Sequence, residues 1–468
     1  MYAGEAKISI NSYLRAMPFE LTREFIGNLR EQIEQNDEKS VAILLSNLHP
    51  ADIAEIFDEL NIEEAKFLYL HVDSEKGADI LIELEDDTRE RFLKALSGEE
   101  IATQFIKEMD SDDAADVIGE LPEQRQEEIL QHIEDVEQAG EIVDLLSYDE
   151  DTAGGLMAKE LIKVNINWNI PTCIREMRKQ AADVDEVYYV YVVDDDDMLH
   201  GLLSLKRLLL ASPKASIKNI YTADIISVKT DTHNEEVANI MEKYDLVALP
   251  VIDSINRLMG RITIDDVVDV IREEAERDYQ LASGIAEDVE PSDNALLLTR
   301  ARIPWLFIGL VGGVVAAIVL GRYEEDLGMY PEMVFFIPLI AAMGGNVGVQ
   351  SSAIIVQGIA ANTIGIESTV RKLFKELTVA LINGTVLSVL MLGYNLIRQE
   401  SLALTATVSI SLFSVILFAS LFGTFIPLIL DRYKIDPALA TGPFITTLND
   451  IVGLAIYLMM GRLLYGLI

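Results

Sequence analysis

A single acidic residue interrupts the last long apolar segment of the chain, and its neighbours carry further polar groups. Asp450 directly follows Asn449, and Thr446 lies one helical turn earlier on the same face. An ionised carboxyl inside an apolar helix is costly unless it faces an aqueous path or a partner. The segment therefore predicts a cation site, with a hydrogen bond between helices as the alternative.

A second polar stretch interrupts another apolar run, where Gly344, Gly345 and Gly348 surround Asn346 and precede Gln350. Small residues at this density permit close helix packing. Amide oxygens lining a narrow wet region would instead hydrogen-bond the water held by an ion. Oxygen donors suit Mg²⁺ or Ca²⁺, and Mg²⁺ gives up its water reluctantly, so a hydrated Mg²⁺ fits the few direct ligands. Each chain offers one carboxylate, and a two-fold dimer would supply two.

The elements that must hold these residues are apolar runs long enough to cross a bilayer. Residues 301–468 carry 10 acids and 9 bases, and most of these charges lie between the runs. We expect an all-α transmembrane domain at 301–468 with five helices, at about 303–321, 333–361, 374–397, 402–430 and 437–462. The second run is interpreted as one long or broken helix.

Lysine and arginine near the ends of these runs set the expected orientation. The side of the N-terminus has Arg300, Arg302, Arg371, Lys372, Lys375, Arg432 and Lys434, and the other side has Arg322, Arg398 and Arg462. We therefore expect a multi-pass protein of the plasma (inner) membrane, embedded in lipid, with a cytoplasmic N-terminus and an extracytoplasmic C-terminus. Residues 1–40 hold no apolar stretch of signal-peptide length.

The first 300 residues have a very different charge from the rest. They hold 67 acids and 28 bases, a net charge of −39. This charge excludes nucleic acid as a partner, because phosphate is repelled. The single Cys173 and the five histidines predict neither a disulfide framework nor a zinc or copper site. The sequence shows neither a nucleophile–base pair nor a phosphate-binding loop, so we do not expect an enzyme. We also expect no obligatory protein partner.

Residues 21–152, after a tail at 1–20, are predicted to form an acidic all-α domain of short amphipathic helices. A weak repeat recurs at 54–60, 78–84 and 115–121, each copy after a helix-start signal. Its uneven spacing indicates a helical superhelix of paired helices. Most acids here fit a solvated face, but Asp112 and Asp116 lie one turn apart and could share a cation.

Strand-rich segments follow, and residues 201–204 repeat at 260–263, an offset of 59 residues. This duplicated strand–strand–helix unit resembles a tandem pair of CBS domains, here an α+β pair at 153–220 and 221–272. Such modules commonly sense adenine nucleotides or ions. In that family a Ser or Thr, followed three residues later by Asp, contacts the nucleotide ribose, and Thr263 with Asp266 keeps this pair. The first copy has Ser204 followed by Arg207, so ATP binding and a purely structural, ion-sensing pair both stay open.

The chain as a whole resembles the MgtE family of magnesium channels and transporters over nearly its entire length. The motifs that carry the resemblance are Asp112-Asp113-Ala114-Ala115-Asp116, Asp151-Thr152-Ala153-Gly154-Gly155, Gly345-Asn346-Val347-Gly348-Val349-Gln350, Asp436-Pro437-Ala438-Leu439 and Gly442-Pro443-Phe444 through Asp450. The expected fold is thus multidomain, with a connecting or plug helix at 273–300 between the CBS pair and the transmembrane domain.

The resemblance implies a homodimer with a pore along its axis and ion selection at Asp450. It also implies closure when cytosolic Mg²⁺, which is both substrate and regulator, fills acidic sites next to the plug helix. Carried onto matching positions, the sensor residues are Asp112, Asp116, Asp266, Asp269, Glu274, Asp278 and Asp436. Arg277 stands where the family's plug motif usually has another acid, which implies a weaker or rearranged sensor there.

The pore residues expected from the sequence are Asp450, Thr446, Asn346, Gln350 and Asn449. The favoured function is a Mg²⁺-selective channel or transporter that imports Mg²⁺ and is closed by it. A secondary carrier for divalent cations is the first alternative. A membrane-anchored nucleotide sensor is the second, but an anchor needs no buried charge such as that of Asp450.

Overall fold

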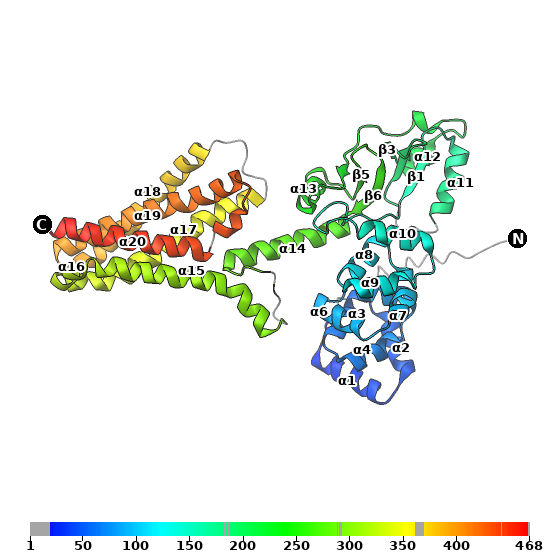
Figure 1. Cartoon of the computed structure of the whole chain (residues 1–468). Coiled ribbons are helices and arrows are strands. Elements are labelled where there is room, and N and C mark those ends of the chain that lie inside the picture. The colour runs from blue at the N-terminus through cyan, green and yellow to red at the C-terminus, as the bar shows by residue number, and fades with distance from the viewer. Residues whose placement is uncertain are drawn as a thin grey trace. The chain divides into compact units, whose positions relative to one another are not determined.

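The computed structural model describes residues 19–181, 184, 187–287, 289, 293–360, 369–440 and 442–466. They belong to two compact units, Met1–Arg272 and Glu273–Ile468 (Figure 1). The parts of the expected domains outside the described residues are the tail up to residue 18, residues 182, 183, 185 and 186 of the first CBS copy, residues 288 and 290–292 of the connecting segment, and residues 361–368, 441, 467 and 468 of the transmembrane domain.

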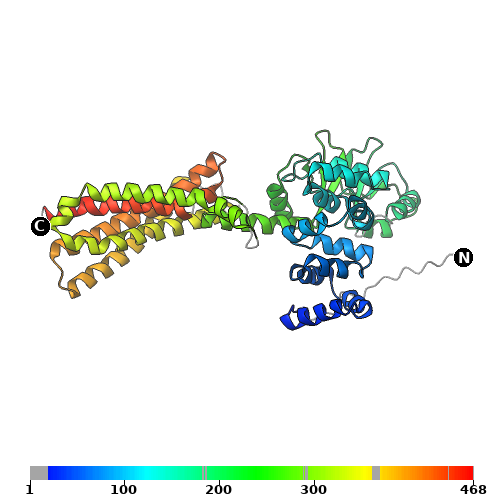
Figure 2. The ribbon, with the colours of Figure 1, turned by 60° about the horizontal axis from the view of Figure 1, so that its bottom comes forward.

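Short helices build the beginning of the first unit, in successive layers (Figure 2). They are α1 (Arg23–Glu34), α2 (Glu38–Asn47), α3 (Pro50–Asp58), α4 (Ile62–Tyr69), α5 (Ser74–Ile82), α6 (Asp86–Lys94), α7 (Gly98–Gln104), α8 (Ser111–Gly119), α9 (Glu123–Leu130) and α10 (Val136–Leu145). Several begin at a capping residue. Asn61 accepts from the backbone N–H of Glu64, whose carboxylate accepts from Asn61 N–H, both at 3.0 Å. The expected helical domain is confirmed.

The weak sequence repeat marks equivalent positions on α3, α5 and α8. The first and fourth residues of each copy are buried, namely Ala54 and Phe57, Ala78 and Leu81, and Ala115 and Ile118. The same hydrophobic core includes Met157, which precedes the first sheet, and continues into the second CBS unit through Val237 and Val267. The helical domain and this CBS unit therefore share one core and are expected to unfold together.

Two three-stranded sheets follow in the described part of the first unit. The first contains β1 (Ile162–Asn165), β2 (Val190–Val193) and β3 (Leu199–Leu203), and the second contains β4 (Val228–Lys229), β5 (Ala248–Ile252) and β6 (Leu258–Thr263). In each, a parallel pair is followed by an antiparallel pair. Helices α11 (Ile170–Gln180), α12 (Leu205–Leu210) and α13 (Asn234–Tyr244) accompany them.

Strand pairing confirms the duplication residue by residue. Val192 pairs with Gly201 in the first sheet, and Val251 pairs with Gly260 in the second, which is the same pairing 59 residues later. Each glycine lies where a side chain would meet the backbone oxygen of a neighbouring segment, that of Thr222 or of Ala158 respectively. The sequence repeat is therefore a repeat of close backbone approaches as well as of strands.

The connecting helix differs in its bounds from the expectation. Helix α14 spans Ile264–Ser283, so it begins directly after β6 and ends well before residue 300. Thr263 and Asp266 explain the start, because the Asp266 carboxylate accepts from Thr263 N–H at 2.9 Å and caps the first turn. Gly284 explains the end, because its φ of +81° is a left-handed conformation that favours glycine.

Five helices in the described residues are long and apolar enough to cross a membrane. They are α15 (Ala295–Gly321), α17 (Ile337–Ala360, extended by a 3₁₀ turn from Pro331), α18 (Thr369–Ile397), α19 (Leu402–Arg432) and α20 (Gly442–Tyr465), with the short α16 (Glu324–Met329) between the first two. Figure 1 shows these long helices side by side. The second apolar run forms one helix in its described part.

Candidate ion-binding sites

The residues around Asp450 lie where α20 meets glycines of two other helices. A Cβ atom added to Gly345 of α17 would lie 3.4 Å from Asp450 Oδ1 and 3.1 Å from Thr446 Cγ2. Gly312 of α15 approaches Thr447 so closely that a side chain there would overlap its methyl group. Glycine at these positions lets the helices approach closely, because a side chain would press against side chains of α20. Close packing and a cation site are therefore compatible explanations of the glycine-rich run.

Two polar neighbours of Asp450 have different surroundings. The Thr446 hydroxyl donates to the backbone oxygen of Gly442 at 2.9 Å, so only its oxygen lone pairs are left for water or an ion. Asn449 is buried, with 1% of its surface exposed, and its side chain lies against Gly348. Among the described residues, neither polar atom of the Asn449 amide has a hydrogen-bond partner. The structure thus brings Thr446 and Gly345 to Asp450 and turns Asn449 toward the helix contact.

Asn346 and Gln350 lie on a different side of α17. Both are exposed, whereas Gly344, Gly348 and Ser351 form the buried side that faces neighbouring helices. At 100° per residue these two groups fall on opposite sides of the helix. Within one chain the two amides are therefore left facing outward.

One membrane carboxylate was missed by the sequence analysis. Glu376 lies inside the helix expected at about 374–397, one residue before the charge-free run that begins at Leu377, and the sequence analysis assigned it no role. In the structure it lies in α18 and accepts a hydrogen bond from Ser351 Oγ of α17 at 2.7 Å. The only sequence signal was a lone acid among Arg371, Lys372 and Lys375 at the helix start.

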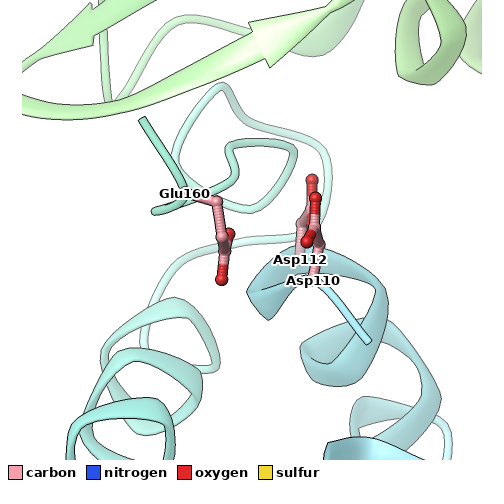
Figure 3. Close-up of side chains that lie close together, drawn as sticks. All are labelled: Asp110, Asp112 and Glu160. Carbon is pink, nitrogen blue, oxygen red and sulfur yellow. The ribbon is translucent and has the colours of Figure 1, made fainter. Parts of the chain in front are cut away.

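The first unit contains a cluster of carboxylates at the start of α8. Asp110, Asp112 and Glu160 have carboxylate oxygens within 4.8 Å of one another (Figure 3). Asp110 and Asp112 flank Ser111, whose hydroxyl donates to Glu160 at 2.7 Å. Glu160 comes from the segment that leads into β1, so the cluster joins the helical domain to the CBS pair. All three side chains are acidic, so none of them offsets the negative charge of the others.

The first turn of α14 adds acids to the cluster. Burial is the main cause that raises the pKa of Asp112 well above its usual value, and Asp113, Asp266, Asp110 and Glu160 raise it further by repulsion. Burial also raises the pKa of Asp113 to about 7, again with Asp266 adding repulsion. The pKa of Asp266 is raised by burial despite the hydrogen bonds that Thr263 donates to it. The cluster is unstable as a set of bare anions.

Asp116 is more exposed and lies one turn along α8. Desolvation is the first cause that raises its pKa to about 7, and Glu150 and Glu120 add repulsion. Arg89 opposes this shift, but its guanidinium is held by Glu120 and Asp86. Asp112, Asp116 and Asp266 are therefore electrostatically linked, as neighbours in one acidic region of the first unit.

Comparison with known proteins identifies the family. The magnesium transporter MgtE of Thermus thermophilus is 33% identical over 440 residues, which cover 93% of this chain and 98% of that protein. The chain belongs to the MgtE family. The MgtE transporters of Bacillus subtilis and Enterococcus faecalis are 32% and 34% identical, over 67% and 69% of this chain and over 69% and 71% of those proteins. The relatives are named transporters, so the chain is a magnesium transporter of several membrane spans.

Family models match each part of this MgtE-family chain. The model described as MgtE intracellular N domain matches residues 48–151, the CBS domain model matches 153–214 and 217–273, and the divalent cation transporter model matches 337–460. Two solved structures are similar to about half of this chain. One, the cytosolic domain of the Mg²⁺ channel MgtE in complex with ATP, has 33% identity and a TM-score of 0.48, and covers 52% of this chain and 99% of that chain. The other, the soluble part of a magnesium transporter, has 29% identity and a TM-score of 0.48, and covers 54% of this chain and 98% of that chain.

The remaining expected sensor residues of the MgtE-family chain lie apart from the cluster or in the second unit. Asp269 is exposed and pairs with Arg272 at 4.0 Å. Glu274 and Asp278 are half-buried, one turn apart on α14, and Glu274 pairs with Arg277 at 3.7 Å. Asp436 is exposed, and its carboxylate accepts from Ala438 N–H at 2.8 Å. Arg277 thus takes up part of the negative charge that the family pattern would leave for an ion.

Helix α14 ends against the helix that carries Asp450. A Cβ atom on Gly442, the first residue of α20, would overlap the backbone oxygen of Ala282. A Cβ atom on Gly284 would lie 2.5 Å from Pro443 Cγ. Both contacts are within the second unit, and both involve a glycine with positive φ. A displacement of the end of α14 would therefore be felt directly at the start of α20.

Proposed function

We propose that the chain forms a homodimeric, Mg²⁺-selective channel that imports Mg²⁺ through the plasma membrane. The observation that carries this proposal is Asp450, a carboxylate held between glycine contacts in a membrane helix, next to Thr446. Few direct ligands suit an ion that keeps its water. The proposal assigns the chain no enzymatic activity, in keeping with relatives that are named transporters.

The homodimer is proposed because one chain leaves both the site and its helices incomplete. Two Asp450 carboxylates about one axis would neutralise a divalent ion. Asn346 and Gln350 face outward, and only 6% of the most apolar stretch of α15 is buried, against 50% for α19. A second copy, with lipid around both, would cover these surfaces, and no other protein partner is invoked.

Closure by cytosolic Mg²⁺ is proposed from the acidic cluster. Burial, with repulsion from neighbouring carboxyls, raises the pKa values of Asp112, Asp113 and Asp266, so ionising them together is unfavourable. A divalent ion removes this cost and draws the start of α14 toward α8. The far end of α14 contacts α20 at Gly442, so ion binding and the pore are mechanically linked.

The free energy needed to close the gate requires several sensor sites. Moving a two-state gate from 1:99 to 99:1 takes about 5.5 kcal/mol of differential binding. A site that binds only the closed state contributes about 1.4 kcal/mol when the free ion is at ten times its dissociation constant. About four such sites are needed. The expected groups are Asp112 with Asp116, Asp266 with Asp269, Glu274 with Asp278, and Asp436.

The proposed direction of transport follows from the orientation, with the acidic unit and the N-terminus in the cytoplasm. It rests on the excess of lysine and arginine on that side of the helices. The C-terminus would then be extracytoplasmic. Protease digestion of sealed vesicles that contain the chain tests the orientation, because only an outward-facing acidic unit would be cut.

ATP is proposed as a modulator that binds the second CBS copy only. Thr263 and Asp266 there are already joined, with Thr263 Oγ1 donating to the carboxylate at 2.8 Å. In the first copy, Arg207 instead donates to Thr222 Oγ1 at 3.0 Å. Calorimetric titration with ATP tests this: Thr263→Val should weaken binding and Arg207→Ala should not. The reverse pattern would place the nucleotide in the first copy.

Ion flux through the purified protein in lipid bilayers tests the main proposal. A channel should pass single-channel Mg²⁺ currents that stop as Mg²⁺ rises on the side of the acidic unit. A carrier, driven by Na⁺ or H⁺, would show flux that depends on the second ion and no unitary current. An anchored sensor would show neither. Mass measurement of the detergent-solubilised protein, which should give two chains, tests the dimer separately.

A further inference from the structure

Three membrane helices meet at a buried polar cluster that the proposed pore does not use. Glu376 Oε1 of α18 accepts from Ser351 Oγ of α17 at 2.7 Å and also from Ser420 Oγ of α19. The two serine oxygens lie 3.1 Å apart, and both serines are almost fully buried. One carboxylate thus receives two hydroxyl groups from two different helices.

The cluster lies one helical turn from a close contact between the backbones of α17 and α19. Gly423 of α19 and Gly348 of α17 approach so closely that a Cβ atom on Gly423 would overlap the Gly348 carbonyl oxygen. Ser351 follows Gly348 by three residues, and Ser420 precedes Gly423 by three. The serine pair therefore continues the same helix–helix contact by one turn.

The same face of α17 contacts the ion-binding segment of α20. Gly348 lies against Asn449, and Gly345 lies against Asp450 Oδ1. Six residues separate Gly345 from Ser351, about 9 Å along a helix. A shift or rotation of α17 at the serine pair would therefore move the wall against which Asp450 is packed.

Glu376 is not placed to be an ion ligand beside Asn346 and Gln350. Those amides lie on the exposed side of α17, whereas Ser351 lies on its buried side. The Glu376 carboxylate is directed at the serines inside the bundle. Hydroxyl groups that donate to an ionised carboxylate form short, strong hydrogen bonds.

We propose that Glu376 is a positioning residue for Mg²⁺ conduction: it joins α17 and α19 through Ser351 and Ser420 and so fixes the wall against which Asp450 lies. The inference rests on the proposed pore at Asp450. The proposed role depends on geometry and not on charge. The site needs an oxygen that accepts two hydroxyl hydrogen bonds, at the end of a side chain as long as that of glutamate. Glutamine supplies such an acceptor without the charge, and alanine does not.

The test compares Mg²⁺ uptake by the full chain in liposomes for Glu376→Ala and Glu376→Gln, with Glu325→Ala as a matched exposed glutamate of α16. Rates are measured over a range of external Mg²⁺ and normalised to folded dimer by size-exclusion chromatography. We expect Glu376→Ala to lower the maximum rate by about fivefold or more with an unchanged KM, as interhelical hydrogen bonds are lost. Glu376→Gln should restore most of the rate, and Glu325→Ala should match the wild type.

Other results would overturn the proposal. A wild-type rate for Glu376→Ala would show that the cluster has no part in conduction. A raised KM in both variants would make the carboxylate an ion ligand, and a fall in folded protein without a fall in normalised rate would make the cluster purely structural. If Glu376→Ala does not fold, Ser351→Ala combined with Ser420→Ala carries the same test, with the same expected fall in maximum rate.

Asp450→Asn, measured in parallel, separates the two proposals. If Asp450→Asn transports normally, the pore assignment fails whatever Glu376 does. If Asp450→Asn is inactive while Glu376→Ala is fully active, only the positioning role is wrong.

Discussion

The two candidate ion sites of this chain are built in opposite ways. At the start of α8, Asp110, Asp112 and Glu160 crowd within 4.8 Å, and the first turn of α14 brings Asp266 to them. In α20, one carboxylate stands among threonine, asparagine and glycine contacts. The first site stores electrostatic repulsion that an ion can relieve, and the second limits negative charge where hydrocarbon would penalise it.

This difference predicts how each site responds to the loss of one carboxylate. A cluster of many acids can lose one carboxylate and still attract a divalent ion, so its effect should weaken by degrees. A site with one carboxylate loses all of its formal negative charge when that residue is replaced. The following predictions test this contrast between the clustered and the single site.

The largest effect is expected at the single site. Asp450→Asn should reduce Mg²⁺ uptake by about tenfold or more, because the only formal charge attracting the divalent ion is lost. Asp450→Glu should keep part of the activity. Uptake by purified protein in liposomes measures both, with the exposed Asp431→Asn at the end of α19 as the control. Equal rates for Asp450→Asn and the wild type would remove the contrast altogether.

Graded loss is expected in the acidic cluster of the first unit. Replacing Asp112 and Asp116 with Asn should move inhibition to higher internal Mg²⁺ without abolishing it, and neutralising several of the expected sensor groups should leave the channel open. Patch recordings against internal Mg²⁺ give the inhibition curve, whose Hill coefficient should exceed one. Glu123 and Glu127, an exposed pair with the same spacing on α9, provide a matched control when replaced with Gln. A Hill coefficient of one, with inhibition lost through one substitution, would disprove distributed sensing.

Close helix packing should contribute to the stability of the membrane unit, and a substitution that leaves every charge unchanged can test this. Gly423→Ala should destabilise the membrane unit by about 1–3 kcal/mol, because the added methyl meets the backbone of Gly348, which cannot rotate away. Gly393→Ala in α18 is the matched control, since nothing lies within 4 Å of its Cβ position. Thermal unfolding in detergent compares them. Equal stability of the two variants would show that the helices separate easily at Gly348.

The smallest effect expected is a linkage between Mg²⁺ and protons. The pKa values of Asp113 and Asp116 are raised to about 7, so Mg²⁺ binding should release protons. Release should be roughly one proton per ion near pH 6.5 and almost none near pH 8.5, where these carboxyls are already ionised. Calorimetry in buffers of different ionisation enthalpy measures it, and Asp113→Asn with Asp116→Asn should reduce it. Release that is independent of pH would contradict the raised pKa values.

The same two carboxyls also determine how stability changes with pH when no divalent ion is present. Their folded pKa values lie above the ordinary carboxyl value, so the folded chain binds more protons than the unfolded chain between about pH 4 and pH 7. The contribution of these two groups to stability should therefore be greatest below this window and fall as pH rises through it. Added Mg²⁺ should reverse the fall at the upper end. Denaturant unfolding of the first unit within the full chain, followed at several pH values, measures both trends.

The sequence by itself determined the elements, because their signals are local. Charge-free runs predicted the five membrane helices, and the 59-residue offset predicted a duplication that strand pairing at Gly201 and Gly260 reproduces. It also singled out Asp450, since a lone charge in an apolar run is visible without a fold. The bounds of α14 were less accessible. The cap formed by Thr263 and Asp266 was interpreted only as a nucleotide motif, and it is also where the helix begins.

Only the tertiary structure decided which side of each element meets another. It turned Asn449 toward Gly348 and left Asn346 and Gln350 facing outward, a choice fixed by helix crossings that no single segment contains. It added Asp110 and Glu160 to the acidic cluster of the first unit, although they are 50 residues apart in sequence. It also showed that Glu376, to which the sequence assigned no role, accepts hydrogen bonds from two buried serines. Hydrophobic periodicity specifies that a side is buried, and the partner that covers it depends on packing between distant segments.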